Sequence, residues 1–99
     1  MLKGSVRKYL RGLAHHLKPV VIVGQSGITK SLTHAVEQAL DDHELIKIRF
    51  NSFKTHKQEL VREIETKTRS EMVGLIGHVA IFYRQQADPE KRAIRLPEK

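Results

Sequence analysis

The stretch PVVIVGQSGITKS, residues 19–31, decides the fold of this chain. It opens with an unbroken apolar and largely β-branched run, which predicts a short strand over 19–23 that is buried on both faces. A loop bounded by two glycines, Gly24–Gly27, follows at once. Thr29 or Ser31 can then accept the capping hydrogen bond of a helix. The stretch therefore predicts a glycine loop between a strand and the N-terminus of a helix.

Hydrophobic periodicity continues on both sides of this loop. Apolar residues recur at helical spacing in three segments and at strand spacing in others. In chain order the pattern predicts a helix over 3–17, the strand 19–23, a helix from 29 or 31 to about 42, a strand over 45–53, a helix over 54–68, strands over 71–76 and 79–84, and a tail over 85–99 that is extended or loosely docked. A chain of 99 residues fits one domain, so we treat 1–99 as a single unit.

The chain is strongly basic, and its charge is clustered. It has 18 Lys and Arg against 11 Asp and Glu, a formal net charge of +7, and no acidic residue before Glu37. On the first helix, Lys3, Arg7 and Arg11 fall on one narrow stripe, which Lys18 extends. Clustered positive charge favours a polyanionic partner, such as nucleic acid or an acidic membrane surface, although a basic protein without such a partner has the same composition.

Several functional classes lack the residues that they need. The sequence contains no cysteine, which excludes disulfides, thiol catalysis and cysteine-based zinc sites and suits a reducing compartment. No apolar run has the length of a membrane span or the character of a signal peptide, so we expect a cytoplasmic protein. The side chains of His15 and His16 point about 100° apart on a helix and cannot share one ion. Without a carboxylate pair or a Ser-His-Asp arrangement, we expect no enzyme, no metal and no cofactor.

The glycine loop has three interpretations. The first is a tight connector in which one or both glycines adopt a positive φ. The second is a nucleotide-binding P-loop, because residues 24–31 match G-x-x-x-x-G-K-S except at Thr29, where the pattern requires glycine. Threonine there would crowd the phosphates, and no strand ends in an aspartate that could hold magnesium. The third is a backbone clamp of the KH type, in which glycines let nucleotides approach and the following helix N-terminus attracts phosphate.

The neighbouring charges favour the clamp. Lys30 in the first turn of a helix opposes the macrodipole, which makes more sense if an anion binds there. Tyr83 and Arg84 could pair a stacking ring with a phosphate-binding guanidinium, although Tyr83 fits the core equally well, and the few aromatic residues give little support to a base-stacking platform. The predicted RNA-binding residues are Lys3, Arg7, Lys8, Arg11, His15, Lys18, Gly24, Gln25, Ser26, Gly27, Lys30, Lys47, Arg49 and Arg84.

Four segments together resemble a known family. They are LRGLAHHLKPVV at 10–21, GQSG at 24–27, HELIK at 43–47 and IFYR at 81–84. In this order they are similar to the bacterial YhbY family, the single-domain form of the CRM RNA-binding domain. The resemblance implies an α/β (α+β) fold of order α-β-α-β-α-β-β with a four-stranded mixed sheet, like the C-terminal domain of bacterial translation initiation factor three.

The same resemblance implies a function. It implies RNA binding through the Gly24–Gly27 loop and an adjacent basic surface, and association with precursors of the large ribosomal subunit; plant relatives act in intron splicing. We expect a monomer. Where many family members have lysine before the last strand, this sequence has His78, so a contact there would be weaker or sensitive to pH. The open alternative is a nucleotide-binding protein that uses residues 24–31 as a degenerate P-loop.

Overall fold

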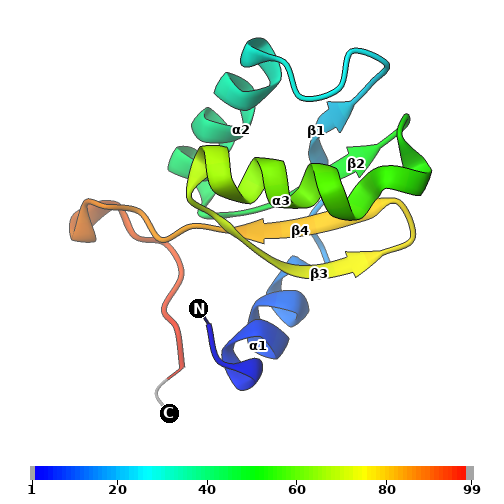
Figure 1. The fold of residues 1–99 in the computed structure, drawn as a ribbon. Coiled ribbons are helices and arrows are strands. Elements are labelled where there is room, and N and C mark those ends of the chain that lie inside the picture. The colour runs from blue at the N-terminus through cyan, green and yellow to red at the C-terminus, as the bar shows by residue number, and fades with distance from the viewer. Residues whose placement is uncertain (1, 98–99) are drawn as a thin grey trace.

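The computed structural model describes residues 2–97, and its helices and strands follow the order predicted from the sequence (Figure 1). In chain order they are α1 (Gly4–Ala14), β1 (Pro19–Val23), α2 (Lys30–His43), β2 (Leu45–Phe50), the 3-10 helix η1 (Lys54–His56), α3 (Lys57–Thr68), β3 (Glu71–Ile76), β4 (Val79–Tyr83) and the 3-10 helix η2 (Pro89–Lys91).

The four strands form one mixed sheet in the order β1-β2-β4-β3. β1 runs parallel to β2, with Val23 opposite Phe50, and the other neighbouring strands are antiparallel. A parallel pair needs a crossover, which α2 supplies. Gly77, with φ +58°, and His78 turn β3 back into β4. The α+β fold with a four-stranded mixed sheet is therefore confirmed.

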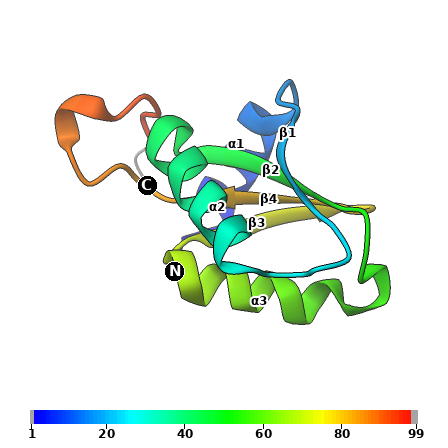
Figure 2. The same cartoon turned by 90° about the horizontal axis from the view of Figure 1, so that it is seen from above.

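Two helices, α2 and α3, cover one face of the sheet (Figure 2). Each presents an apolar stripe whose members recur every three or four residues, so that one side of the helix meets the strands. The buried cluster between helices and sheet consists of Val21, Val23, Val36, Leu40, Ile46, Ile48, Phe50, Val61, Ile64, Ala80 and Phe82. Full burial of a side chain of this size contributes about 1.5–3 kcal/mol, so this layer dominates the stability of the fold.

The third helix, α1, covers only part of the opposite face. Its Leu10 and Ala14 are fully buried in a second, smaller cluster with Val73 of β3 and Ile81 of β4. Ile94 of the C-terminal tail packs against the same cluster. No helix in residues 2–97 covers the part of this face that β1 forms. This finding contradicts the predicted burial of the strand 19–23 on both faces.

The prediction that the strand 19–23 is buried on both faces is wrong. Val20 and Ile22 are 52% and 55% exposed, while Val21 and Val23 are buried. β1 is an edge strand. α1 packs over β4 and β3, which lie at the opposite end of the strand order β1-β2-β4-β3. An unbroken apolar run does not distinguish a central strand from an edge strand with one bare face.

Two predicted boundaries also shift. The first helix ends at Ala14 and not at Leu17, since the N–H of Leu17 donates to the carbonyl of Ala14 in a tighter turn, and the residue before Pro19 is disfavoured in helical conformation. The strand predicted over 45–53 ends at Phe50, and Phe53 has left-handed backbone angles, φ 59° and ψ 36°.

A buried carboxylate holds the tail that follows β4. Glu44 is 1% exposed and accepts hydrogen bonds from the backbone N–H groups of Gln86 (2.8 Å), Ala93 (2.8 Å) and Ile94 (2.9 Å). Burial alone would raise the pKa of Glu44, but these N–H groups and the charge of Arg92 outweigh it and hold the pKa below 4.5. The tail predicted over 85–99 is therefore docked as far as the described residues reach; 98 and 99 lie outside them.

We predict that Glu44→Gln lowers the free energy of unfolding at pH 7 by about 1–3 kcal/mol, because an amide cannot satisfy three N–H donors. Because the folded-state pKa is depressed, the stabilisation is complete above pH 4.5 and is lost as the pH falls through the folded value. Urea unfolding from pH 7 to 3 should thus show the difference between wild type and variant shrinking.

The matched control for this experiment is Glu65→Gln, because Glu65 accepts a single backbone N–H, from Met72 (2.7 Å). Its effect should be clearly smaller. Equal losses in the two variants at pH 7 would contradict the role assigned to Glu44.

Candidate nucleic-acid interface

The Gly24–Gly27 loop is a tight turn at the end of β1. The N–H of Gly27 donates to the carbonyl of Gly24 (3.1 Å), and Gly27 has φ +70°. Gln25 and Ser26 at the tip are exposed. A Cβ added to Gly24 would meet nothing within 4 Å. Gly27 is therefore required by the backbone conformation, whereas Gly24 keeps the outer surface of the loop open.

The loop leads into the N-terminus of α2, which is capped and positively charged. The hydroxyl of Thr29 accepts a hydrogen bond from the N–H of Leu32 (3.0 Å), so Thr29 and not Ser31 is the cap. Lys30 is the first residue of the helix and is exposed, and the first turn contains no acidic residue. The partial positive charge of the helix end is thus increased and not neutralised, which favours an anion beside the loop.

The basic stripe of α1 is partly used by the protein itself. Arg7 forms an ion pair with Glu71 (2.6 Å), and Arg11 donates to the carbonyl of Val73 (2.9 Å). The stem of Arg11 crosses Gly74, where a Cβ would lie 2.8 Å from the Cδ of Arg11. These two arginines hold α1 against β3.

Four of the five lysines of the predicted site remain available. Lys3, Lys8, Lys18 and Lys30 are exposed, and none forms an ion pair or a side-chain hydrogen bond with residues 2–97. His15 is also exposed, with its ring 5.3 Å from that of His16.

The strand β1 separates Lys18 from the glycine loop. Lys18 precedes β1 and the loop follows β1, so the five residues of the strand, roughly 17 Å, lie between them. The cations of α1 and the loop are two parts of a surface and do not adjoin.

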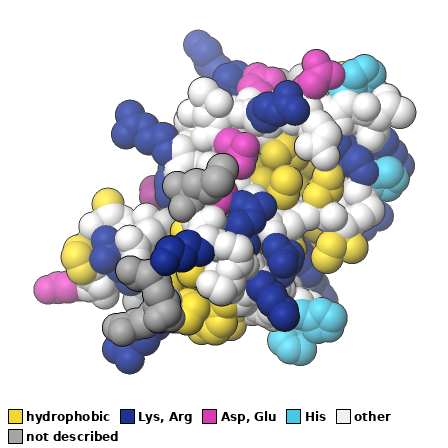
Figure 3. Space-filling view, turned by 60° about the horizontal axis from the view of Figure 1, so that its bottom comes forward, with side chains coloured by type: hydrophobic (Ala, Val, Ile, Leu, Met, Phe, Trp, Pro, Cys, Tyr) yellow, Lys and Arg dark blue, Asp and Glu magenta, His cyan; other side chains and the backbone are white. Residues whose placement is uncertain are grey.

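The open half of the sheet lies between these two parts. Lys47 and Arg49 project from β2, and Arg49 is paired with the exposed Ile22 of β1. Lys47 donates to the carbonyl of Leu17 (3.0 Å), and Arg49 donates to the side chain of Asn51 (3.2 Å). Figure 3, which brings the α1 side forward, shows Lys and Arg side chains beside an apolar area. This face is therefore both cationic and apolar.

Arg84 differs from the other predicted residues, because the protein neutralises its charge. Its guanidinium forms ion pairs with Glu37 and Asp41 and donates to the carbonyl of Thr68 (2.8 Å). The network joins the end of β4 to α2 and α3, and the side chain is 20% exposed. Tyr83 beside it is a core residue, 4% exposed. The side chain of Arg84 therefore serves to join β4 to the two helices.

Sequence analysis missed a group of residues beside the glycine loop. The loop-end cluster, as we name it, consists of Phe53, Lys54, Lys57 and His78. The loop after β1, the loop after β2 and the β3–β4 hairpin all lie at one end of the sheet (Figures 1 and 2). The amine of Lys57 donates to the carbonyl of Gly77 (2.5 Å) and lies 3.0 Å from Nδ1 of His78. No motif marks the cluster, and its one sequence signal is His78 in place of lysine.

The electrostatics of the cluster are those of crowded positive charge. Partial desolvation of the ring, followed by the charges of Lys57, Lys54 and Arg49, lowers the pKa of His78 below 6.5. The ring of His78 is therefore harder to protonate than an ordinary imidazole, and in the neutral tautomer without a proton on Nδ1 it can accept a hydrogen bond from the Lys57 ammonium group. An anion at this end of the sheet would relieve the repulsion.

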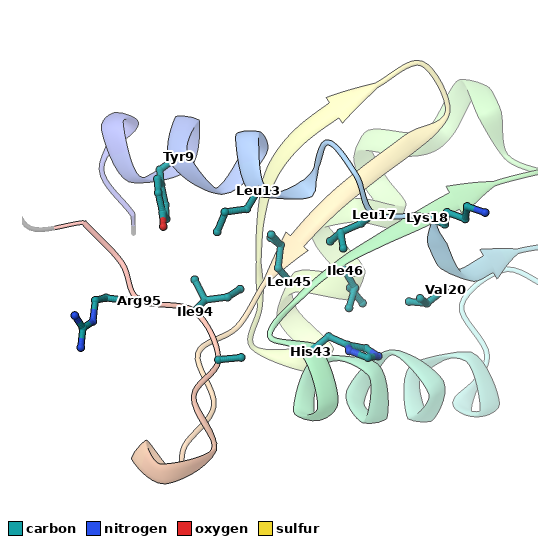
Figure 4. Close-up of a pocket in the computed structure, with 11 residues that line it drawn as sticks. Tyr9, Leu13, Leu17, Lys18, Val20, His43, Leu45, Ile46, Ile94 and Arg95 are labelled. Atoms are coloured by element: carbon teal, nitrogen blue, oxygen red, sulfur yellow. The ribbon is translucent and has the colours of Figure 1, made fainter.

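An apolar groove lies on the side of α1 that faces the tail (Figure 4). Tyr9 and Leu13 project from α1 toward Ile94 of the tail, and Leu17 and Val20 continue the lining toward β1. The rim carries the cations Lys18 and Arg95 together with His43.

Residues 2–97 show neither a metal site nor a membrane-spanning helix. No three His, Cys, Asp or Glu side chains come together there as metal ligands. None of the helices in this range is both long and apolar enough to cross a bilayer.

Comparison with known proteins assigns the family. The model of the CRS1 / YhbY (CRM) domain matches residues 2–84. The chain belongs to this family. An RNA-binding protein of Haemophilus influenzae is 38% identical over 99 residues, which are 99% of this chain and 97% of the relative. The probable RNA-binding protein YqeI of Bacillus subtilis is 31% identical, over 98% of this chain and all of the relative.

A solved structure shares the fold of this CRM domain. The solution structure of a hypothetical protein from Staphylococcus aureus has a TM-score of 0.80 and 35% sequence identity, covering 98% of this chain and 100% of that one. Two of the sequence predictions, membership of the YhbY family and the architecture that it implies, are thereby confirmed.

The two loop glycines of this CRM domain should differ in stability tests. Gly27→Ala forces a side chain into φ +70° and should cost about 1–2 kcal/mol, whereas Gly24→Ala meets open space and should leave stability unchanged or slightly raised. Thermal melts of the two variants provide the measurement. A loss at Gly24 as large as that at Gly27 would contradict the roles assigned here.

Proposed function

We propose that this protein is an RNA-binding assembly factor that associates with precursors of the large ribosomal subunit. It holds the sugar-phosphate backbone with the Gly24–Gly27 loop and with lysines on both sides of β1. The observation that carries the proposal is the loop itself. It has an open outer surface at Gly24 and leads into α2, where no acidic side chain in the first turn neutralises the partial positive charge of the helix N-terminus.

Support for RNA as the partner comes from two directions. The free lysines have no carboxylate partner among residues 2–97 and are spread over α1, the start of β1 and the start of α2, which suits an extended polyanion. The relatives from Haemophilus influenzae and Bacillus subtilis carry RNA binding in their names. Phosphate contacts of this kind position a nucleic acid without reading its sequence.

The set of contact residues follows from which cations are free. The phosphates are contacted by Lys3, Lys8, Lys18 and Lys30. His15 and the loop residues Gln25 and Ser26 also contact the RNA backbone. Lys47 and Arg49 contribute from the open face. Arg7 and Arg11 contribute to the positive potential while they hold α1. The ribosomal target rests on the family resemblance, the proposed cytosolic location rests on a sequence without cysteine that suits a reducing compartment, and we propose no enzymatic activity.

The first test places a bulky residue in the loop. Gly24→Leu should weaken binding to fragments of large-subunit ribosomal RNA by roughly tenfold or more while the melting temperature stays within a few degrees, because the site is open. Fluorescence anisotropy with ATP as a competitor gives the measurement. Unchanged affinity in this folded variant would refute the clamp, and displacement of RNA by ATP would favour a degenerate P-loop at 24–31.

A second test counts phosphate contacts by salt dependence. For single-stranded RNA, each phosphate contact contributes roughly −0.7 to the slope of log affinity against log salt, so the four free lysines account for about −3 of it. Lys18→Glu should reduce the magnitude of this slope by about 0.7 and weaken binding alike for different RNA sequences. Lys91→Glu, an exposed lysine in η2, is the charge-matched control and should change neither. A loss confined to one sequence would argue against backbone contact.

A further inference from the structure

The exposed ring of Phe53 lies directly beside the glycine loop. We propose that this ring stacks on an unpaired RNA base while Lys54 and Lys57 contact the adjoining phosphates. The inference rests on the proposed RNA binding and adds to it a preference for single-stranded over duplex RNA.

Phe53 adopts a backbone conformation that a turn alone would not select. Its φ of 59° and ψ of 36° lie in the left-handed region, which costs a bulky L-residue free energy that glycine or asparagine would largely avoid. The turn itself needs only the backbone, since the N–H of His56 donates to the carbonyl of Phe53 (2.9 Å). The ring is 40% exposed and belongs to neither buried cluster. Core packing therefore does not account for an aromatic residue here.

The ring is held next to the loop that is proposed to bind phosphate. Its Cε2 and Cζ atoms lie 3.5 and 3.6 Å from the position that a Cβ on Gly27 would occupy. A nucleotide whose phosphate rests against Gly24–Gly27 thus has this ring as its nearest exposed aromatic surface. Phe50, Phe82 and Tyr83 are buried. Tyr9, 41% exposed, is on α1, on the opposite side of the sheet from α2 and α3.

The cations of the loop-end cluster surround the same place. Lys57 reaches the β3–β4 turn, where it donates to the carbonyl of Gly77, and Lys54 lies three residues earlier in η1. No carboxylate within residues 2–97 forms an ion pair with either lysine or with Arg49. An aromatic face flanked by unpaired cations is the arrangement by which proteins bind single-stranded nucleic acid.

Stacking on Phe53 requires a base whose face is free. In a duplex both faces of each internal base are covered by its neighbours, so the ring gains nothing, whereas an unpaired base in a loop, bulge or end can be taken up. Because every base has a π-face, the contact selects strandedness and not sequence.

The test begins with paired aromatic-to-aliphatic variants. Phe53→Leu should bind a labelled single-stranded RNA roughly 5- to 100-fold more weakly than wild type and bind an RNA duplex unchanged. Tyr9→Leu removes an equally exposed ring and should alter neither affinity. Unchanged single-strand binding by Phe53→Leu, or an equal loss on duplex, overturns the stacking proposal.

A second variant gives a direct signal that does not depend on affinity. The chain contains two tyrosines but no tryptophan, so Phe53→Trp places a single tryptophan at the stacking position, whose fluorescence can be excited selectively at a wavelength that tyrosine does not absorb. Single-stranded RNA should quench its fluorescence, and the same RNA with abasic sites should bind without quenching. Equal spectra with both RNAs overturn the proposal.

The outcomes also separate this inference from the proposed function. If Gly24→Leu weakens RNA binding while both Phe53 variants behave as wild type toward single strands, RNA binding stands and stacking fails. If the wild-type chain binds neither single-stranded RNA nor ribosomal RNA fragments, the proposed function fails, and the inference fails with it.

Discussion

The parallel pairing of β1 with β2 is the constraint on which the rest of this structure depends. Two neighbouring parallel strands finish at the same end of a sheet. The segments that leave them are therefore brought together however far apart they lie in sequence. The N–H of Asn51, just past β2, donates to the carbonyl of Val23 at the end of β1 (3.0 Å) and joins the two exits. The glycine loop and Phe53 meet for this reason. α2 must begin at the same end of the sheet, because it returns the chain to the start of β2.

The same pairing leaves β1 at the edge of the sheet, and this decides the character of the second face. α1 has to cover the antiparallel pair β3 and β4, where Leu10 and Ala14 find a buried cluster. The outer half keeps Val20 and Ile22 exposed beside Arg49. A cationic surface with apolar side chains results between α1 and the glycine loop. Phosphates and ribose or base edges of RNA offer matching chemistry along one strand.

Much of the fold could be predicted because its signals are local. The β-branched run, the Thr29 cap and the two glycines act within a few residues, and the structure has each of them where the sequence indicates. The burial of β1 could not be predicted, since periodicity reports which residues are apolar and not which element covers them. The position of β1 at an edge is a property of the sheet as a whole.

The candidate site was predicted less completely, because charge is readable from sequence and charge pairing is not. From sequence alone, Arg84 is a plausible phosphate ligand. In the fold its guanidinium pairs with Glu37 and Asp41, which precede it by 47 and 43 residues. The loop-end cluster was missed for the converse reason. Lys57 and His78 are 21 residues apart, and only the turn of the β3–β4 hairpin brings them within hydrogen-bonding distance.

Gly27 and Phe53 show how closely the two exits lie against each other. Both have left-handed backbone angles, φ +70° and +59°, and each lies at the turn that ends its strand. The Cε2 and Cζ atoms of the ring lie 3.5 and 3.6 Å from the position that a Cβ on Gly27 would occupy, which is ordinary contact, so it is the backbone angle and not the ring that requires glycine there. A spacing of two glycines is common among connectors, and what distinguishes this one is the aromatic and cationic surface that the parallel strands bring against it.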